Sequence, residues 1–121
     1  PEANGYLALT RQWKAGDTIA FEVPLTIQRV KGIDLIEATR DKVALRCGPL
    51  VYSFENVDQK LGPEKVLSPT AELQPHWRDD LLEGVMTIQG QWTDGSPLLA
   101  IPNYARHNRG KTQSQVWVRD K

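Results

Sequence analysis

The sequence predicts an all-β domain, namely an antiparallel β-sandwich of jelly-roll-like form with one long irregular loop. Three observations support this class. Apolar residues alternate with polar ones in short runs, clusters of Gly, Pro and Asp separate the runs, and no stretch of ten residues shows the spacing of a helix. About seven short strands with turn residues between them are typical of a sandwich.

The first half of the chain contains four runs with strand periodicity, and they cover residues 5–10, 18–23, 43–47 and 50–55. Within the second run, Ile19, Phe21 and Val23 share one face. Pro24 then removes a backbone donor, so we expect the pairing to stop there or to lie on an edge. Gly48-Pro49 predicts a bend between the last two of these strands.

The second half contains three further predicted strands, at residues 85–92, 98–104 and 115–119. Residues 56–84 break the pattern, because they hold three prolines and many charges. They predict a long loop with a helical turn near 77–83, and loops of this length often have a function. The inward faces of all the strands predict a core of Leu7, Leu9, Ile19, Phe21, Val23, Ile27, Val43, Leu45, Leu50, Tyr52, Phe54, Met86, Ile88, Leu99, Ile101, Val116 and Val118.

Length and charge restrict the classes of partner. The chain has 121 residues, so residues 1–121 are expected to form a single domain. Fifteen basic residues balance fifteen acidic ones, which gives no field to attract nucleic acid or anionic lipid. No apolar run approaches the ~18 residues of a membrane span. A chain that opens on Pro1 is expected to be a fragment or a processed chain, which leaves its localisation open.

The residue pattern indicates neither a catalytic centre nor a cofactor site in this chain. A glycosidase requires a pair of carboxyl groups on either side of the scissile bond, and no motif in this sequence fixes such a pair. The carboxylates considered are Glu22, Glu37, Glu55, Asp58, Asp79, Asp80, Glu83 and Asp94. His76 and His107 are far apart and Cys47 is single, so no metal site is expected. Cys47 alternates with Val43 and Leu45, which predicts a small buried hydrophobe rather than a reactive thiol. Serine-nucleophile, phosphate-loop and dinucleotide motifs are absent from the sequence.

Sugar binding is the one site hypothesis that the residue types support. Aromatic rings stack on sugars, and Asn, Arg and His supply directed hydrogen bonds. The candidate carbohydrate-binding residues are Trp77, Tyr104, His107, Asn108 and Arg109, with Trp92 beside them. The favoured interpretation is packing instead, in the core for Trp13, Trp92 and Tyr52, and at an interface for Trp77, Tyr104 and Trp117.

Three segments carry a resemblance to a known family. They are Asn4-Gly5-Tyr6-Leu7 with Trp13-Lys14-Ala15-Gly16-Asp17, the segment from Val43 to Tyr52 with its Gly48-Pro49 pair, and the segment from Ala100 to Gly110 that runs on to Val116-Trp117-Val118. In this order and spacing they resemble the C-terminal region of the β-L-arabinofuranosidase family, glycoside hydrolase family 127, over about residues 4–119. The sequence departs from the family at Asn103, Arg106 and His107, where a more aromatic stretch is common.

The resemblance implies an accessory domain without catalytic residues. Family members carry their catalytic cysteine, acidic residues and zinc ligands in an upstream (α/α)6 barrel, and nothing in this chain matches those motifs. Cys47 stands where relatives often have an arginine. The leading hypothesis is therefore a non-catalytic domain of a bacterial glycoside hydrolase that packs, through its two long loops, on the catalytic barrel or on a second subunit.

Two other hypotheses remain open from the sequence. A carbohydrate-binding module that takes a glycan is the main alternative, and an independent enzyme ranks last. The resemblance also implies that further sandwich sequence precedes Asn4-Gly5-Tyr6. A strand missing from that side would leave an exposed sheet edge.

Overall fold

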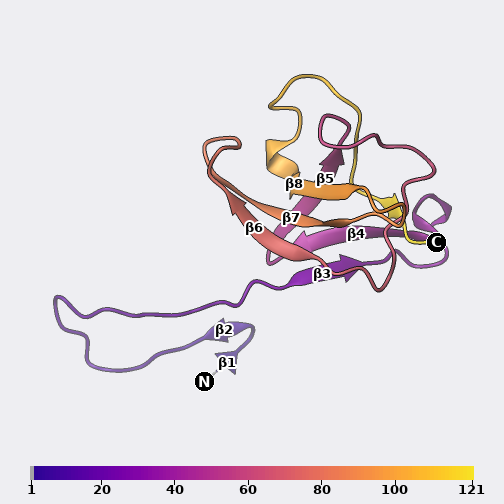
Figure 1. Ribbon diagram of the computed structural model, residues 1–121. Helices are drawn as coiled ribbons and strands as arrows, with labels where there is room; N and C mark the ends of the chain where they lie inside the picture. The colour runs from indigo at the N-terminus through magenta and orange to yellow at the C-terminus, as the bar shows by residue number, and fades with distance from the viewer. Residues whose placement is uncertain (1) are drawn as a thin grey trace.

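The computed structural model describes residues 2–121 and shows a curled β-sheet from which a long N-terminal arm extends (Figure 1). Ten strands and two short 3-10 helices make up its elements. Their bounds are β1 Glu2–Ala3, β2 Tyr6–Leu7, β3 Ile27–Val30, η1 Glu37–Thr39, β4 Lys42–Cys47, β5 Leu50–Glu55, β6 Gln74–Arg78, β7 Val85–Gln91, β8 Pro97–Pro102, η2 Asn103–Ala105, β9 Ser114–Gln115 and β10 Val118–Arg119. No helix among the described residues is long and apolar enough to cross a bilayer.

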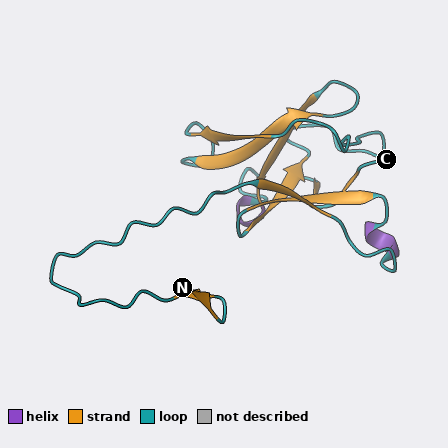
Figure 2. Cartoon of the chain, turned by 90° about the horizontal axis from the view of Figure 1, so that it is seen from below, coloured by secondary structure: helices purple, strands orange, loops and turns teal. Residues whose placement is uncertain are grey.

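The main sheet is antiparallel and has the order β10-β4-β5-β8-β7-β6, with β3 on β4 and β9 on β5. The C-terminal segment joins two of these strands, since β9 pairs with β5 and β10 pairs with β4. The sheet therefore curls around its own inner face rather than lying flat, as Figure 2 shows. The prediction of an antiparallel all-β class is confirmed.

The core lies inside the curl. Phe54 and Trp92 are buried there with their ring centroids 5.3 Å apart. The buried side chain of Gln59 fastens a loop to this core. Its Oε1 accepts hydrogen bonds from Trp92 Nε1 at 3.2 Å and from the Leu99 backbone N–H at 3.0 Å, and its Nε2 donates to the Leu99 carbonyl at 2.8 Å. A buried amide with both ends satisfied fixes one arrangement of the residues around it.

The predicted strands at 5–10 and 18–23 do not join this sheet. Only Tyr6–Leu7 is a strand there, and it pairs with β1 alone. The apolar residues of these runs were predicted to be core and are exposed instead, namely Leu7, Leu9, Ile19, Phe21 and Val23. The alternation is genuine, but the described residues provide no sheet on which this apolar face could pack. That part of the core prediction is wrong for this chain.

The predicted long loop at 56–84 is interrupted by a strand. Gln74–Arg78 forms β6 at the edge of the sheet. Pro75 is tolerated in an edge strand because one side of such a strand has no neighbour that needs a backbone donor. The expected helical turn near 77–83 is a non-helical turn with positive φ at Leu82, Glu83 and Gly84. The remaining loop at 56–73 is anchored on its own domain, because Leu67 is fully buried.

Smaller differences concern the ends of the sheet. Leu98 is buried where Leu99 was predicted, and Val116 is only half-buried. The last predicted strand is divided into β9 and β10. Leu50 and Met86, which were predicted to lie in the core, are 38% and 37% exposed. The apolar interior is thus open at the end of the sheet where β5 and β7 begin.

Candidate functional site

A buried ion-pair cluster holds the loop that follows β8. Glu55, the last residue of β5, is fully buried. Arg109 donates a hydrogen bond to Glu55 Oε1 at 3.1 Å and one to each carboxylate oxygen of Asp58 at 2.6 Å. These hydrogen bonds, chiefly those to Asp58, raise the pKa of the Arg109 guanidinium, while burial acts in the opposite direction. Both carboxylates are therefore committed to a fixed cation, an arrangement that suits a structural role better than acid–base chemistry.

The same loop is fastened at a second point. His107 adopts a left-handed backbone, with φ of 67°, and its N–H donates to Glu55 Oε2 at 3.1 Å. Its ring Nε2 lies 3.2 Å from Ser114 Oγ at the start of β9. Asn108 between these two anchors is exposed. The loop is thus clamped at its middle, and only its outer side chains reach solvent.

Two exposed aromatic rings lie at the end of the sheet where β7 begins. Trp77 on β6 is 57% exposed, and its ring covers Gly84, where a Cβ atom would come within 2.6 Å of Trp77 Cζ2. Tyr104 in η2 is 71% exposed. Met86 links the two regions, because it is the ladder partner of Trp77 and its carbonyl accepts the hydroxyl of Tyr52 at 2.8 Å. The exposed side chains of Trp77, Met86 and Tyr104, together with Leu50, form a rim around the open end of the core.

Tyr52 marks the boundary between this rim and the core. Burial raises the pKa of Tyr52 to about 12, with smaller contributions from Cys47 and Tyr104. Cys47 lies in the buried core, as its alternation with Val43 and Leu45 predicts.

The structure divides the five predicted sugar-binding residues between two regions. Four lie in the single loop after β8, and Trp77 lies on β6. Arg109 turns inward to its carboxylates, and the ring of His107 faces Ser114. Trp77, Tyr104, His107 and Asn108 are exposed. Of the tryptophans predicted to be core, Trp92 is buried whereas Trp13 is 48% exposed on the arm.

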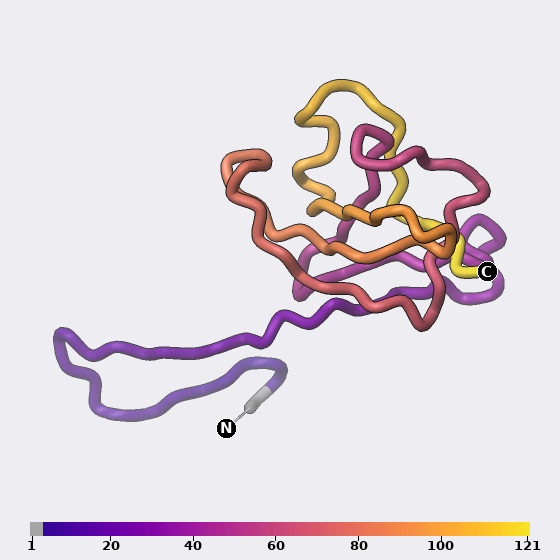
Figure 3. Tube along the Cα trace, viewed as in Figure 1, coloured from indigo at the N-terminus to yellow at the C-terminus, as the bar shows by residue number. Residues whose placement is uncertain are grey.

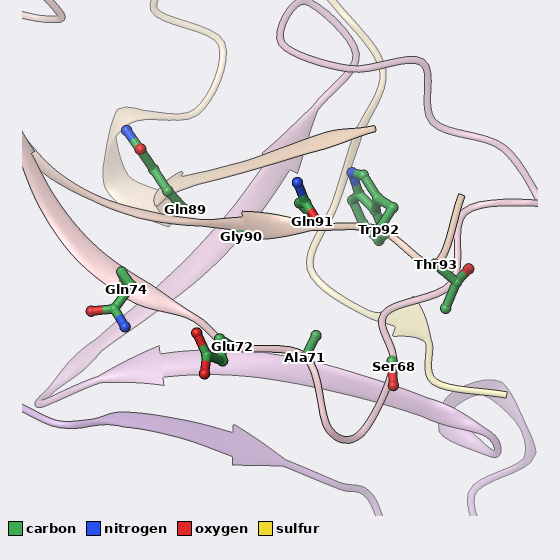
Figure 4. A pocket seen from close by; sticks show the side chains of 9 residues that line it. All are labelled: Ser68, Ala71, Glu72, Gln74, Gln89, Gly90, Gln91, Trp92 and Thr93. Carbon is green, nitrogen blue, oxygen red and sulfur yellow. The ribbon is translucent and has the colours of Figure 1, made fainter. Parts of the chain in front are cut away.

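A groove of about 600 Å3 lies elsewhere, between the 68–74 segment and β7 (Figure 4). Its polar lining comes mainly from Glu72, Gln74, Gln89 and Gln91. Gly90 lets the two walls approach, because a Cβ atom there would lie 2.9 Å from the carbonyl oxygen of Glu72. Amide side chains can exchange hydrogen bonds with hydroxyl groups. The one aromatic residue of this lining, Trp92, is buried, so the groove offers no stacking platform.

Several other acidic residues of the described chain form ion pairs of their own. No group of three or more His, Cys, Asp or Glu side chains in residues 2–121 is arranged to hold a metal ion. Asp80 forms a bidentate ion pair with Arg78 on the surface, at 2.6 and 2.7 Å. Lys65 binds Asp94 at 2.6 Å. Together with the Arg109 cluster, these contacts neutralise four of the eight carboxylates named above.

Sequence reasoning missed two features of these sites. The buried role of Glu55 was not foreseen, because its partner Arg109 is 54 residues away in sequence. The groove had a visible signal, since Gln89-Gly90-Gln91 places two amides on one face of a strand around a glycine. Neither pattern by itself specifies a ligand.

The fold and these contacts define a class of protein: an all-β module whose buried charges hold its own loops. Comparison with known proteins then gives the family. Residues 27–119 match the model of the glycoside hydrolase family 127 C-terminal domain, and the chain belongs to that family. This confirms the resemblance carried by the segments at 43–52 and 100–118.

Solved structures agree with this assignment. A GH127 β-L-arabinofuranosidase from Geobacillus stearothermophilus T6 is 34% identical, with a TM-score of 0.74 over 81% of this chain and 19% of that chain. The GH127 β-arabinofuranosidase BT3674 is 24% identical, with a TM-score of 0.71 over 80% of this chain and 17% of that one, and shows the shared fold. The chain thus spans about a fifth of the length of these relatives. No curated protein sequence matches it significantly.

Proposed function

We propose that this chain is a non-catalytic accessory domain of a longer family 127 glycoside hydrolase, and that it packs on the rest of that enzyme. The observation that carries the proposal is the match to the family's C-terminal domain over residues 27–119. The parent's substrate class is proposed from the 34%-identical relative, which is a β-L-arabinofuranosidase. Catalysis belongs to the parent's other domains.

The contacts of the charged residues support a role without catalysis. Each catalytic carboxylate of a glycosidase must be free to take up a proton or to attack the sugar. Glu55, the most buried carboxylate near the loop after β8, is instead paired with Arg109 and bonded to the His107 N–H. Its partner Asp58 is held in bidentate fashion by the same arginine. Neither group has the freedom that the chemistry requires.

The rim at the open end of the sheet supports packing on another part of the enzyme. Trp77, Met86, Leu50 and Tyr104 each expose more than a third of their surface at this one end. Clustered exposed apolar residues of this kind mark contact surfaces in soluble proteins. The catalytic domain of the parent chain is the partner that we propose, either directly or through an intervening domain.

A turnover assay tests the proposal. The 121-residue chain and its longer parent would each be incubated with a chromogenic β-L-arabinofuranoside. We expect product from the parent only. Turnover by the 121-residue chain that is abolished by changing one of its own carboxylates would overturn the proposal.

A further inference from the structure

A cavity of about 530 Å3, separate from the groove at β7, lies where the C-terminal segment meets the 56–70 loop and the start of β4. Figure 3 shows the C-terminal segment, in yellow, running beside this loop. The contact is fixed by backbone hydrogen bonds at two points. The Leu67 N–H donates to the Arg119 carbonyl at 2.8 Å, and the Asn56 N–H donates to the Gln113 carbonyl at 2.8 Å. The walls of the cavity are therefore held by the fold itself.

The polar side chains that line this cavity are cationic or neutral. The cations are Lys42, Lys65 and Arg119, the amides are Gln113 and Gln115, and none of the lining residues is acidic. The chain as a whole has no net charge, so three cations around one cavity are a local excess. Such a set of side chains supplies hydrogen-bond donors for a negatively charged group.

Two of these cations form a like-charge pair across the sheet. Lys42 and Arg119 lie directly opposite one another in the β4–β10 ladder. Side chains at such positions share a face of the sheet, with Cβ atoms about 4.5–5.5 Å apart, and like charges there are destabilising. Within residues 2–121 neither has a carboxylate partner, because Lys42 donates to the Ala38 carbonyl at 2.9 Å and Arg119 to the Pro63 carbonyl at 3.2 Å. An anion bound by both side chains relieves their repulsion.

Two carboxylates lie close to the cavity, and neither neutralises this pair. Asp94 accepts a hydrogen bond from Lys65 Nζ at 2.6 Å. Hydrogen bonds, chiefly that from Lys65, lower the pKa of Asp94, so this carboxylate stays ionised and neutralises the third cation of the cavity. Glu64 turns back over Gly62 and forms no ion pair in the described part of the chain. The cation pair of the β4–β10 ladder is therefore left for a ligand.

Trp117 gives the cavity one aromatic wall. Its side chain is half-buried in the link between β9 and β10, and it borders the same cavity as Gln113 and Gln115. Aromatic rings stack on the apolar faces of sugars, and amide side chains exchange hydrogen bonds with hydroxyl groups. The cations, amides and indole together match a sugar that carries an acidic group. The groove at β7 has neither the cations nor an exposed ring.

We propose that this cavity binds an acidic sugar, with its oxyanion held by Lys42 and Arg119, its ring against Trp117 and its hydroxyl groups on the two glutamines. The oxyanion is a carboxylate or a phosphate, since the cations bind either group through the same charge-assisted hydrogen bonds. The site is additional to the accessory role and independent of it, because this chain alone forms the cavity. Neutral sugars lack the group that the cation pair binds, so we expect no measurable binding from them.

Isothermal titration calorimetry of the 121-residue chain tests the site. Glucuronate, glucose 6-phosphate, inorganic phosphate and glucose are titrated in turn at low ionic strength. We expect glucuronate or glucose 6-phosphate to bind saturably with a Kd of about 1 mM, and the tighter of the two identifies the oxyanion. Inorganic phosphate and glucose should bind at least roughly tenfold more weakly, because each lacks one half of the ligand. Added salt should weaken the binding of the acidic sugar.

Paired variants separate binding from folding. Arg119→Gln should weaken binding roughly tenfold or more. Arg46→Gln is the matched control, because Arg46 is an exposed arginine of β4 that does not border the cavity, and it should leave binding unchanged. Lys42→Gln should also weaken binding, while its melting temperature without ligand equals or exceeds that of the unchanged chain, because a repulsion is removed.

Three results would overturn the proposal. The first is a lack of saturable binding by both acidic sugars. The second is an affinity for glucose or inorganic phosphate that equals that of the acidic sugar, because the ring and the oxyanion would then not act together. The third is equal binding by Arg119→Gln and Arg46→Gln, because the cation pair would then play no part.

Discussion

Removing the Arg109 guanidinium, by Arg109→Met, should destabilise the domain strongly. The change leaves Glu55, which is fully buried, and Asp58, whose side chain is 10% exposed, without their cation. Breaking a buried pair by removing one partner costs about 3–5 kcal/mol. The Arg109 side chain is itself 21% exposed, and the His107 N–H still serves Glu55, so we expect the lower end, about 3 kcal/mol.

Urea unfolding followed by the fluorescence of the buried Trp92 measures this effect. With a urea dependence of about 2 kcal/mol/M, the midpoint should fall by roughly 1.5 M. Arg106→Met is the matched control, because Arg106 is exposed on the same loop and forms no ion pair in residues 2–121. Adding Glu55→Gln to Arg109→Met should recover part of the loss. A midpoint for Arg109→Met that equals the control would refute the view that this cluster holds the loop.

Three further outcomes are expected. Gly90→Ala should cost about 1–3 kcal/mol in urea unfolding, because its Cβ atom would meet Leu73 at 2.8 Å and the Glu72 carbonyl at 2.9 Å; a neutral change would show that the walls of the groove move freely. The raised pKa of Tyr52, about 12, means that the unfolded chain releases this proton first. Stability should therefore be complete below pH ~10 and fall as the pH rises toward 12, and Tyr52→Phe should flatten that fall; an unchanged slope would contradict the assignment. Calorimetry against a panel of arabinose-containing glycans should show no saturable binding, and a saturable isotherm would favour the carbohydrate-binding alternative.

The sequence could predict the strands whose partners lie within the same domain. Residues 43–47 and 50–55 alternate in sequence and are β4 and β5 in the structure, where residues of both faces are buried. The run at 18–23 alternates just as clearly and remains exposed. Periodicity identifies residues that pack on a sheet, but it does not say which sheet supplies the partner. The strand β6 was missed for the opposite reason, because Gln74-Pro75-His76-Trp77-Arg78 has little apolar alternation and lies at an edge.

The candidate site was harder to predict than the fold. Trp77 and Tyr104 are exposed as an interface hypothesis requires. Arg109 was expected at the surface, and its actual role depends on Glu55 and Asp58, both more than 50 residues away. No local pattern shows that a carboxylate at the end of a strand is covered by a distant loop. Such pairs emerge only once the sheet brings the two segments together.

The domain is proposed to contribute packing to the parent enzyme and no chemistry. The most direct test measures kcat for the parent enzyme carrying changes in this domain's carboxylates, well below the unfolding temperature. The exposed changes Glu72→Gln, Asp79→Asn and Glu83→Gln should leave both kcat and the melting temperature unchanged. Glu55→Gln should lower the melting temperature while kcat stays within about twofold, a change of less than 0.5 kcal/mol in the barrier. A loss of about 100-fold or more in kcat from any of these changes, with the fold intact, would contradict the claim.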